Sequence, residues 1–453
     1  MPYIPHTKTC VETMLANIGE QEIDALFDEI PPTLQLSHIE GLPEGQDELD
    51  VLRDFAEIAN RDPKLICFAG AGSYDHHIPA AVWDVTGRGE FMTSYTPYQG
   101  EASQGTLQLL YEYQSMMCAL TGQDVSNASV YDGGTALAEA VLMAIRSSPR
   151  ARRAKRFEVL AANGVHPHYL AAVNTCVSGQ GITLRSLAMN DDGVTRQDLP
   201  DGEPPIALIV QQPNVFGRLE DVDALSRWAK AHGVMLIAVV NPMSLALLKT
   251  PADWGDGGAD IVCGDGQPFG VPMASGGPTH GFITCRKSLV RQLPGRIVGR
   301  TEDHHGRTGF VLTLQAREQH IRRAKATSNI CTNQGLLVTA STLYLSIMGA
   351  SGIREIAARC HENTRQLTRA LCGLGGVERR FAGPVFHEDV IRLPRPASDV
   401  SAALAHDWGI FAGIPLGSWY PELDDCLLVC ATEKRTDSEI EHYRHALREV
   451  LGA

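Results

Sequence analysis

The segment IVCGDGQPFGVP, residues 261–272, joins a short apolar run to a polar turn rich in glycine. Residues 261–263 are apolar throughout, and the turn that follows carries Asp265 and Gln267. A short, continuous apolar run bounded by turn residues is typical of a strand that is buried on both faces. We therefore expect a buried strand here, with polar side chains just beyond its carboxyl end.

The sequence on either side of this segment repeats the pattern. Further strands are expected at residues 157–161, 182–184, 206–210, 235–240 and 280–284. Helices are expected between or before them at 106–121, 135–146 and 221–232. Short apolar strands that alternate with helices predict a mainly parallel sheet covered on both faces. The fold class is therefore α/β, and this large domain is expected to span residues 66–330.

The two ends of the chain follow other patterns. Residues 1–65 contain amphipathic stretches at 20–30 and 47–60 between proline breaks, which predict a helical arm packed on the main domain or on a partner. Residues 331–453 combine strand candidates at 390–393 and 426–431 with several expected helices: 333–348, 352–371, 398–407 and 438–451. The sequence thus predicts a third part, a small α+β domain at the C-terminus.

Bulk composition excludes several classes of function. The 453 residues include 39 Lys and Arg against 53 Asp and Glu, a formal net charge of −14, which disfavours binding to nucleic acid or anionic lipid. No apolar run approaches the roughly 20 residues of a membrane span, and no secretory signal is visible. The eleven cysteines show no CxxC pattern and no Cys/His metal spacing. These features predict a reduced, cytoplasmic protein without a metal site.

The turn YDGGTAL, residues 131–137, has two interpretations. Gly133 and Gly134 allow close approach of the backbone, and Thr135 stands at the start of an expected helix, whose free amides favour an anion. Such a turn can hold a phosphate group. It can equally be a tight turn in which Thr135 caps the helix, and this fragment alone does not favour the phosphate.

The order of these elements resembles the large domain of pyridoxal enzymes of the aspartate aminotransferase type, also called fold type I. In that fold an aspartate after one strand pairs with the cofactor ring, and a lysine after a later strand forms the Schiff base. Here Asn241 follows the strand at 235–240, and Gln267 stands where the lysine is expected. A neutral amide cannot form an aldimine. Neither Lys249 nor Lys287 has the expected position, so the fold is predicted to lack its own covalent cofactor.

Several longer motifs carry a more specific resemblance. They are YIPHT at 3–7, TSYTPYQ at 93–99, FGVP at 269–272 with GGP at 276–278, REQHIRR at 317–323 with KATSNICTN at 325–333, and LVCATEK at 428–434. Together they resemble the N-terminal half of the glycine cleavage system P-protein over essentially the whole chain. The length resembles the separate first subunit of the split bacterial form.

The resemblance implies an α2β2 enzyme. A homologous second subunit would carry pyridoxal 5′-phosphate on its lysine, and the pair would decarboxylate glycine and pass the aminomethyl group to the lipoyl H-protein. Two alternatives stay open. One is a structural or regulatory pseudoenzyme subunit that contributes no active-site residue. The other is an independent pyridoxal aminotransferase or lyase that uses Lys249 or Lys287.

Two segments are candidates for contributions to the partner's active site. A polar and aromatic loop ahead of the helix at 106–121 offers catalytic candidates, unless it only packs against that helix: Tyr95, Thr96, Tyr98, Gln99 and Glu101. Hydroxyl and amide side chains ahead of the helix at 333–348 are candidates to bind the partner's cofactor, unless they only cap that helix: Ser328, Asn329, Thr332 and Asn333. Residues 133–135 are interpreted as a vestigial phosphate cup. The pair His76-His77 is interpreted as structural.

Overall fold

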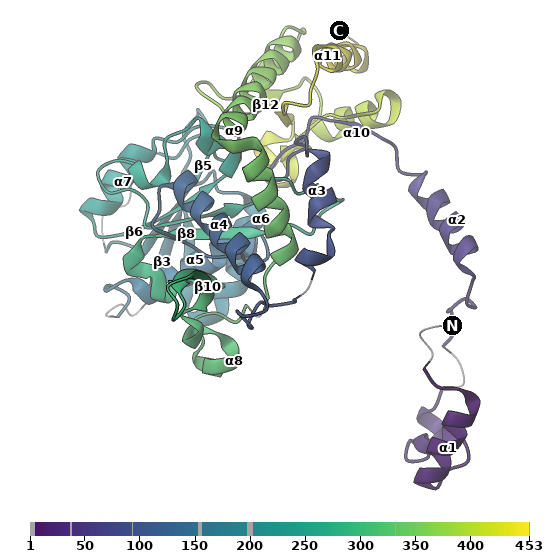
Figure 1. The fold of residues 1–453 in the computed structure, drawn as a ribbon. Helices are drawn as coiled ribbons and strands as arrows, with labels where there is room; N and C mark the ends of the chain where they lie inside the picture. The colour runs from purple at the N-terminus through teal and green to yellow at the C-terminus, as the bar shows by residue number, and fades with distance from the viewer. Residues whose placement is uncertain are drawn as a thin grey trace. The chain divides into compact units, whose positions relative to one another are not determined.

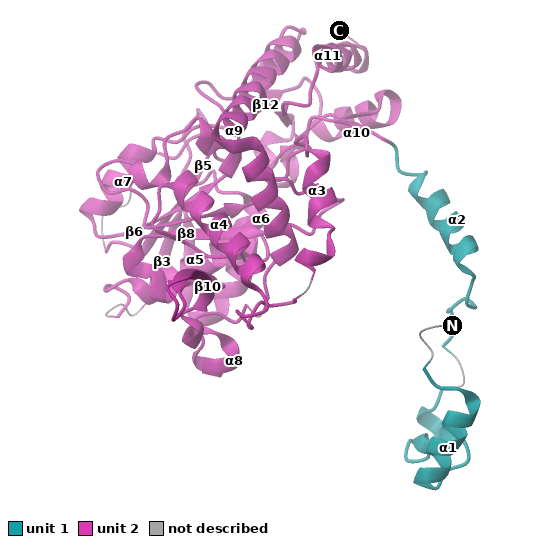
Figure 2. Ribbon diagram, in the orientation of Figure 1, with its two compact units in different colours: residues 1–63 teal, residues 64–453 magenta. Residues whose placement is uncertain are grey.

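The computed structural model describes residues 5–36, 39–92, 94–152, 156–196, 203–330 and 332–452. These form two compact units, residues 1–63 and 64–453, which are coloured separately in Figure 2. Residues 3–4, Thr93 and Cys331 of the motifs quoted above lie outside the described residues. The division of the second unit at residue 330 stays a prediction.

The first unit consists of short helices. Helix α1 (Lys8–Ile18) begins after the capping residue Thr7, and helix α2 (Glu48–Ala59) begins after Asp47, whose carboxylate accepts from the Asp50 amide. The prediction of a helix at 20–30 is wrong, because only the 3-10 turn η1 (Asp24–Phe27) forms among these residues. Residues 31 and 32 are prolines, which disfavour a helical conformation of the residue before them. Large apolar side chains of α2 stay exposed, namely Leu49, Leu52, Phe55 and Ile58.

The second unit is built on a seven-stranded sheet in the order β2-β8-β7-β6-β5-β3-β4 (Figure 1). Five neighbouring strands are parallel: β3 (Phe157–Ala161), β4 (Ile182–Ser186), β5 (Ala207–Gln212), β6 (Met235–Val240) and β7 (Ile261–Asp265). Strand β8 (Gly281–Cys285) runs antiparallel to β7, and β2 (Val125–Ser126) runs antiparallel to β8. The predicted mainly parallel sheet and α/β fold class are confirmed.

Helices cover both faces of this sheet because its strands are apolar on both sides. Leu160 belongs to a core with α4 (Gln104–Thr121) and α7 (Val222–Ala231), whereas Val159 and Ala161 belong to a second core. The second core contains α5 (Gly133–Ser147) and α6 (Pro167–Val177). The alternation of strand side chains between two cores is what a doubly covered sheet requires.

Helix α9 (Gly335–Cys372) joins the large sheet to the C-terminal elements. It contributes Val338 to the core with α4 and Leu367 to the core of the C-terminal part, and it is kinked at Gly349, where φ is 58°. By length and composition α9 is able to cross a membrane, but half of its apolar window is buried, as expected for a core helix.

The C-terminal elements form a four-stranded sheet with helices. Its order is β11-β12-β15-β14, all antiparallel: β11 (Glu378–Arg379), β12 (Glu388–Arg392), β15 (Cys426–Cys430) and β14 (Ile414–Pro415). Helices α10 (Ala397–Trp408) and α11 (Asp437–Leu451) pack on it. The short strand β1 (Ile66–Cys67) pairs with β13 (Ile410–Phe411), so the start of the second unit lies against its C-terminal elements.

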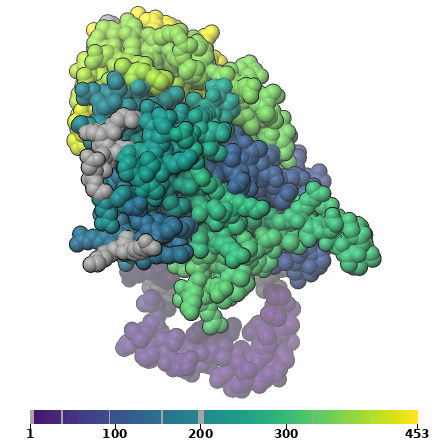
Figure 3. Space-filling view, turned by 90° about the vertical axis from the view of Figure 1, so that its left-hand side faces the viewer, coloured from purple at the N-terminus to yellow at the C-terminus, as the bar shows by residue number. Residues whose placement is uncertain are grey.

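A hairpin that the sequence patterns did not predict completes the second unit. Strands β9 (Ile297–Glu302) and β10 (Thr308–Thr313) are antiparallel, and the amide group of Gln104 on α4 bonds to both backbone groups of Phe310. Figure 3 shows green segments, which the colour bar places near residue 300, projecting from the surface. This hairpin brings residues 294–330 beside the loop ahead of α4.

Candidate functional site

Gln267 follows β7 and is buried. Its Oε1 accepts from the Tyr74 amide at 2.8 Å, and its Nε2 donates to the Tyr74 carbonyl at 2.9 Å and to the Val271 carbonyl at 2.8 Å. Three bonds satisfy most of the hydrogen-bonding capacity of the amide group. The side chain that replaces the expected lysine therefore holds two backbone segments together.

The amino end of α5 is occupied by a carboxylate of the chain itself. The Gly133 amide donates to Asp265 Oδ2 at 3.0 Å, while Asp265 Oδ1 accepts from the Gln267 amide at 2.9 Å and from the Thr279 hydroxyl. Burial raises the pKa of Asp265 to about 6, against the lowering effect of these hydrogen bonds. An anion site of the kind that a helix N-terminus offers is thus filled by Asp265.

The neighbouring residues close this helix end further. Asp132 is the N-cap, with its Oδ1 accepting from the Thr135 amide at 2.7 Å, so the interpretation of Thr135 as the cap is wrong. Thr135 is the third helical residue and bonds back to Asp132 in a capping box. A Cβ atom at Gly133 would lie 2.2 Å from the Tyr169 hydroxyl, so glycine is required for this close approach.

The space beside this helix end is small. A cavity of about 30 Å³ lies among Tyr74, His166, Tyr169, Asn241 and Asp265. Such a volume holds about two water molecules at roughly 10–15 Å³ each and is too small for a pyridine ring. Asn241 caps the turn after β6 and its Nδ2 lies 3.0 Å from His387 Nε2, so an amide stands at the end of β6, where the fold is expected to carry an aspartate.

A larger pocket lies at the surface, where the two segments predicted from the sequence meet. Its volume is about 220 Å³, and it is lined by side chains from both segments and from the strand ends between them: Tyr98, Arg296, Arg317, Glu318, His320, Ser328, Thr332 and Asn333. The structure thus brings Tyr98 together with Ser328, Thr332 and Asn333. Gln99, Glu101 and Asn329 are exposed and are not among the described residues that line the pocket.

Arg296 holds the two segments together. One terminal nitrogen, Nη2, donates to the Thr96 hydroxyl at 2.7 Å, and the other donates to Asn333 Oδ1. Arg296 is 7 % exposed, and its Nε has no partner in the described part of the chain. The planar guanidinium suits two acceptors on separate segments, which a lysine cannot reach at once.

Hydroxyl contacts fix the remaining side chains. The Tyr95 hydroxyl donates to the Thr332 hydroxyl at 2.6 Å, and the Tyr98 hydroxyl donates to Glu318 Oε2 at 3.2 Å. Burial raises the pKa of Tyr98, as does the neighbouring charge of Glu318. Ser328 donates to Glu139 Oε1 at 2.8 Å. The pocket is therefore preorganised by bonds within this chain.

The sequence patterns did not identify Arg296, and they included Arg317 only in the motif REQHIRR at 317–323. The Arg317 guanidinium donates to the Gly295 carbonyl at 3.1 Å, which ties the pocket floor to residues 294–296. The position of Arg296 directly before the apolar residues Ile297 and Val298 is the one local signal, because an arginine that is buried beside apolar residues needs several hydrogen-bond acceptors. Its acceptors are distant in sequence, so no local pattern marks them.

The fold itself is that of pyridoxal-phosphate enzymes of fold type I. Two solved structures share it at low identity: a sphingosine-1-phosphate lyase of Burkholderia pseudomallei (TM-score 0.66, 15 % identity, 93 % of this chain and 94 % of that chain) and a glutamate decarboxylase of Lactobacillus brevis (TM-score 0.68, 13 %, 92 % and 95 %). These likenesses concern the fold alone.

A more specific relationship follows from closer matches. The family model described as "Glycine cleavage system P-protein" matches residues 1–447, and the chain belongs to this family. A crystal structure of glycine decarboxylase (P-protein) of the glycine cleavage system, in inhibitor-bound form, is 40 % identical with a TM-score of 0.90 over 100 % of both chains.

Curated relatives agree with this family. "Probable glycine dehydrogenase (decarboxylating) subunit 1" of Nitrosospira multiformis is 54 % identical over 457 residues, covering 100 % of this chain and 99 % of the relative. The protein of the same name from Legionella pneumophila strain Lens is 53 % identical over 458 residues, with the same coverage. The resemblance inferred from the motifs is confirmed.

P-proteins depend on pyridoxal 5′-phosphate. The residues of this chain do not fit that cofactor at the position that the fold offers. Gln267 provides no amine, Asp265 fills the anion site at Gly133, and the adjoining cavity of about 30 Å³ does not admit the ring. A phosphate next to the Asp265 carboxylate would meet like charge at close range.

Proposed function

We propose that this chain is the non-lysine subunit of glycine dehydrogenase (decarboxylating). It acts together with a homologous second subunit that carries pyridoxal 5′-phosphate on its own lysine. The pair decarboxylates glycine and transfers the aminomethyl group to the lipoyl arm of the H-protein. The name "subunit 1" of the relatives supports the need for a second subunit, and Gln267 supports the absence of a Schiff base in this one.

The observation that carries the proposal is the contrast between the two sites. The fold's usual cofactor position is closed by Asp265 and Tyr169, whereas the surface pocket around Arg296 is open and preorganised. A subunit that kept a catalytic role without its own cofactor would have this combination. The alternative of a pseudoenzyme without active-site residues does not require a preorganised pocket and is not favoured.

The pocket is suited to an anionic group of the partner. Arg296, Arg317 and His320 line it, and Glu318 is the one carboxylate among the described residues that do so. Guanidinium groups bind phosphate and carboxylate oxygens with two parallel bonds. We propose that Ser328, Thr332 and Asn333 position this pocket against the partner's cofactor phosphate.

Tyr95 is the candidate for contact with the partner's active site. Its ring is 82 % exposed while its hydroxyl is held by Thr332, an arrangement that presents a fixed aromatic surface to another molecule. Tyr98, Gln99 and Glu101 belong to the same loop, and their catalytic contributions stay predictions. These groups would orient the substrate and exclude water from the partner's site.

The third hypothesis, an independent pyridoxal enzyme, finds no support around the lysines it needs. Lys249 Nζ pairs with Asp223 Oδ1 at 2.9 Å at a half-exposed site, and neither Lys249 nor Lys287 is among the described residues that line the small cavity. The α2β2 assembly, docking of the H-protein and the cytoplasmic location are also proposals.

The proposal is tested by mixing the separately purified subunits. Glycine–CO2 exchange is expected only in the mixture, and borohydride is expected to fix the cofactor to the second subunit alone. Borohydride trapping of pyridoxal phosphate on this chain would contradict the assignment of the cofactor. Full exchange by the second subunit alone would contradict the need for this chain.

A further inference from the structure

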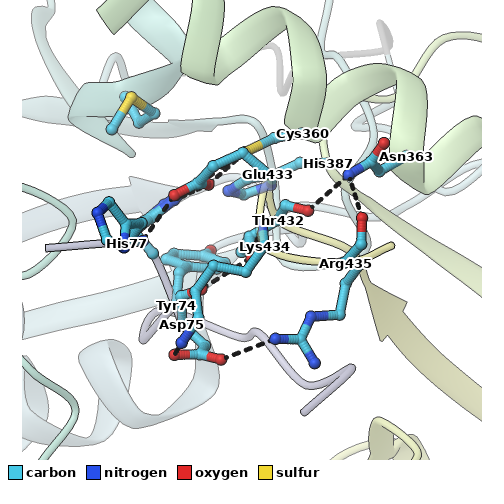
Figure 4. Close-up of polar contacts among 12 residues, drawn as sticks. Tyr74, Asp75, His77, Cys360, Asn363, His387, Thr432, Glu433, Lys434 and Arg435 are labelled. Carbon is cyan, nitrogen blue, oxygen red and sulfur yellow. Dashed lines mark hydrogen bonds and ion pairs between the residues drawn. The ribbon is translucent and has the colours of Figure 1, made fainter. Parts of the chain in front are cut away.

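A second cluster of chemically active side chains shares no residue with those that line the surface pocket, and two of its members, Cys360 and Glu433, are labelled in Figure 4. His76 comes from the segment after β1, Cys360 from α9 and Glu433 from the loop after β15. His76 Nδ1 lies 2.8 Å from Glu433 Oε2, and the Cys360 thiol donates to the same oxygen at 3.2 Å. The Cys360 Sγ and His76 Nδ1 atoms are 4.0 Å apart. Three donor atoms of different chemistry thus converge on one point.

The cluster is buried, and the polar groups around it are not all satisfied. The side chains of His76 and Glu433 are 2 % and 9 % exposed. Within the described residues, His76 Nε2 and His387 Nδ1 are buried without a hydrogen-bond partner. The two rings stack 6.4 Å apart. A buried polar atom without a partner costs about 1–3 kcal/mol, so the two imidazoles beside the cluster call for a further hydrogen-bond partner such as water.

We propose that His76, Cys360 and Glu433 form a binding site for a divalent transition-metal ion of the zinc type. Imidazole nitrogen, thiolate sulfur and carboxylate oxygen are the donors that Zn²⁺ takes in proteins. Bond lengths of about 2.0–2.3 Å in a tetrahedron separate such ligand atoms by about 3.3–3.6 Å. The observed separations of 2.8, 3.2 and 4.0 Å bracket that range, so shifts of about half an ångström complete the geometry.

Binding of the ion changes the protonation of its ligands in a way that balances. Cys360 releases its thiol proton to solvent and binds as the thiolate, while Glu433 binds as the carboxylate. Neutral His76 binds through Nδ1 and carries its proton on Nε2, the atom that has no protein partner among the described residues. The bound ion and its two anionic ligands are then neutral together.

The fourth ligand would be water from a neighbouring cavity that His76 lines, although neither Cys360 nor Glu433 is among the described residues that line it. A cavity of about 310 Å³ is lined by His76 itself and by neighbours that include Tyr74, Gln267 and Lys434. Three protein ligands and one water make a complete zinc coordination shell. No linear motif marks the site, because His76 and Cys360 are 284 residues apart and Cys360 and Glu433 are 73 apart.

The ion would reinforce a junction between segments that are distant in the chain. Asp75 Oδ1 already pairs with Lys434 Nζ at 2.6 Å, and the His77 amide donates to Glu433 Oε1 at 2.6 Å. Tyr74, one residue earlier, is the backbone partner of Gln267. An ion bound here would therefore join α9 and the loop after β15 to the segment whose Tyr74 backbone holds Gln267.

The test uses the full chain purified without chelators. Titration with Co²⁺ is expected to produce a thiolate-to-cobalt charge-transfer band that saturates near one equivalent, and Zn²⁺ is expected to abolish it. Cys360→Ser should remove the band, whereas Cys372→Ser, on the same helix but outside the cluster, should retain it. Absence of the band, or a band of equal intensity in Cys360→Ser, overturns the proposal.

A second measurement, the melting temperature Tm, does not depend on the cobalt absorbance band. Zn²⁺ is expected to raise the Tm of the wild type and of Cys372→Ser, because a ligand that binds only the folded state stabilises it. The Tm of Cys360→Ser should not respond, and Glu433→Gln should weaken Co²⁺ binding by about tenfold or more. An equal Tm response in Cys360→Ser and Cys372→Ser contradicts the site even when both variants fold.

Discussion

The hydroxyl of Tyr95 donates a hydrogen bond to the hydroxyl of Thr332 at 2.6 Å, although the two residues are 237 positions apart. Arg296 makes the parallel connection between Thr96 and Asn333. Two segments that the sequence identified separately are therefore one surface. The proposed role of this chain in a partner's active site depends on that surface being intact.

Tyr95→Phe tests the role of the hydroxyl. Loss of one net hydrogen bond, about 0.5–1.5 kcal/mol, should lower glycine–CO2 exchange in the mixed complex by about 2- to 13-fold. Thr332→Val should have a similar effect, and the double variant should be no worse than either one. Exchange kinetics measure this directly.

Tyr111→Phe is the matched control. Tyr111 lies on α4, outside the pocket, and its ring packs against Phe310 of β10. This variant should leave exchange unchanged. If Tyr95→Phe and Thr332→Val have independent, multiplying effects, the hydroxyl pair does not act as a unit and the proposed surface is wrong.

Arg296→Lys tests the guanidinium that joins the two segments. An ammonium cannot reach the Thr96 and Asn333 acceptors together, so one charge-assisted bond of about 1.5–3 kcal/mol should be lost. Urea unfolding should show a free energy of unfolding that is lower by this amount, and glycine–CO2 exchange in the mixed complex should fall as well. Arg300→Lys, at an exposed position of the same hairpin, should change neither. Wild-type stability of Arg296→Lys would contradict the bridging role.

Gln267→Lys tests whether a lysine alone restores the missing function. We expect no pyridoxal adduct after borohydride treatment, because Asp265 still occupies the anion site. A buried ammonium that cannot accept from the Tyr74 amide should also destabilise the chain by about 2–4 kcal/mol. Gln180→Lys, at an exposed position, is the control for stability. Stoichiometric adduct formation by Gln267→Lys would show that the cofactor position is open.

Glu388→Gln tests a pH dependence that burial creates. The Glu388 carboxylate accepts from the Ala71 amide at 2.6 Å and from the Tyr74 hydroxyl at 2.9 Å, and burial raises its pKa from 4.5 to about 7. A carboxyl whose pKa is raised by folding contributes stability that is present below pH 4.5 and lost as pH rises through 7. The unfolding free energy of the wild type should therefore fall over this range relative to Glu388→Gln, by roughly 3 kcal/mol at most.

The control for this titration is Glu378→Gln, an exposed carboxyl of the same sheet. Its unfolding free energy should follow the wild-type curve. Parallel curves for the wild type and Glu388→Gln between pH 4.5 and 7 would contradict the raised pKa.

Much of the fold could be predicted because its strands are buried on both faces. The strands expected at 157–161 and 235–240 coincide with β3 and β6, since their buried positions, 159–161 and 236–240, carry apolar side chains throughout. The helix expected at 47–60 formed within one residue at each end because Asp47 caps it. The hairpin β9–β10 was missed because its strands are half exposed and carry polar residues.

The site was predictable only in part. The polarity of the two segments that contain Tyr95 and Thr332 identifies them as candidates in the sequence. The hydrogen bond between these two residues depends on the tertiary fold. Arg296 was not identified because its acceptors come from segments more than 30 residues away on either side. Asp265 is adjacent to the expected lysine position, yet its occupation of the Gly133 amide becomes visible only when β7 lies beside α5.

The most direct test of the account measures glycine–CO2 exchange with four samples: this chain, the lysine-bearing subunit, their mixture, and the mixture made with Tyr95→Phe. The account predicts no exchange by this chain alone, full exchange only in the wild-type mixture, and a clear decrease with Tyr95→Phe at unchanged subunit association. Equal exchange by the lysine-bearing subunit with and without this chain would contradict it.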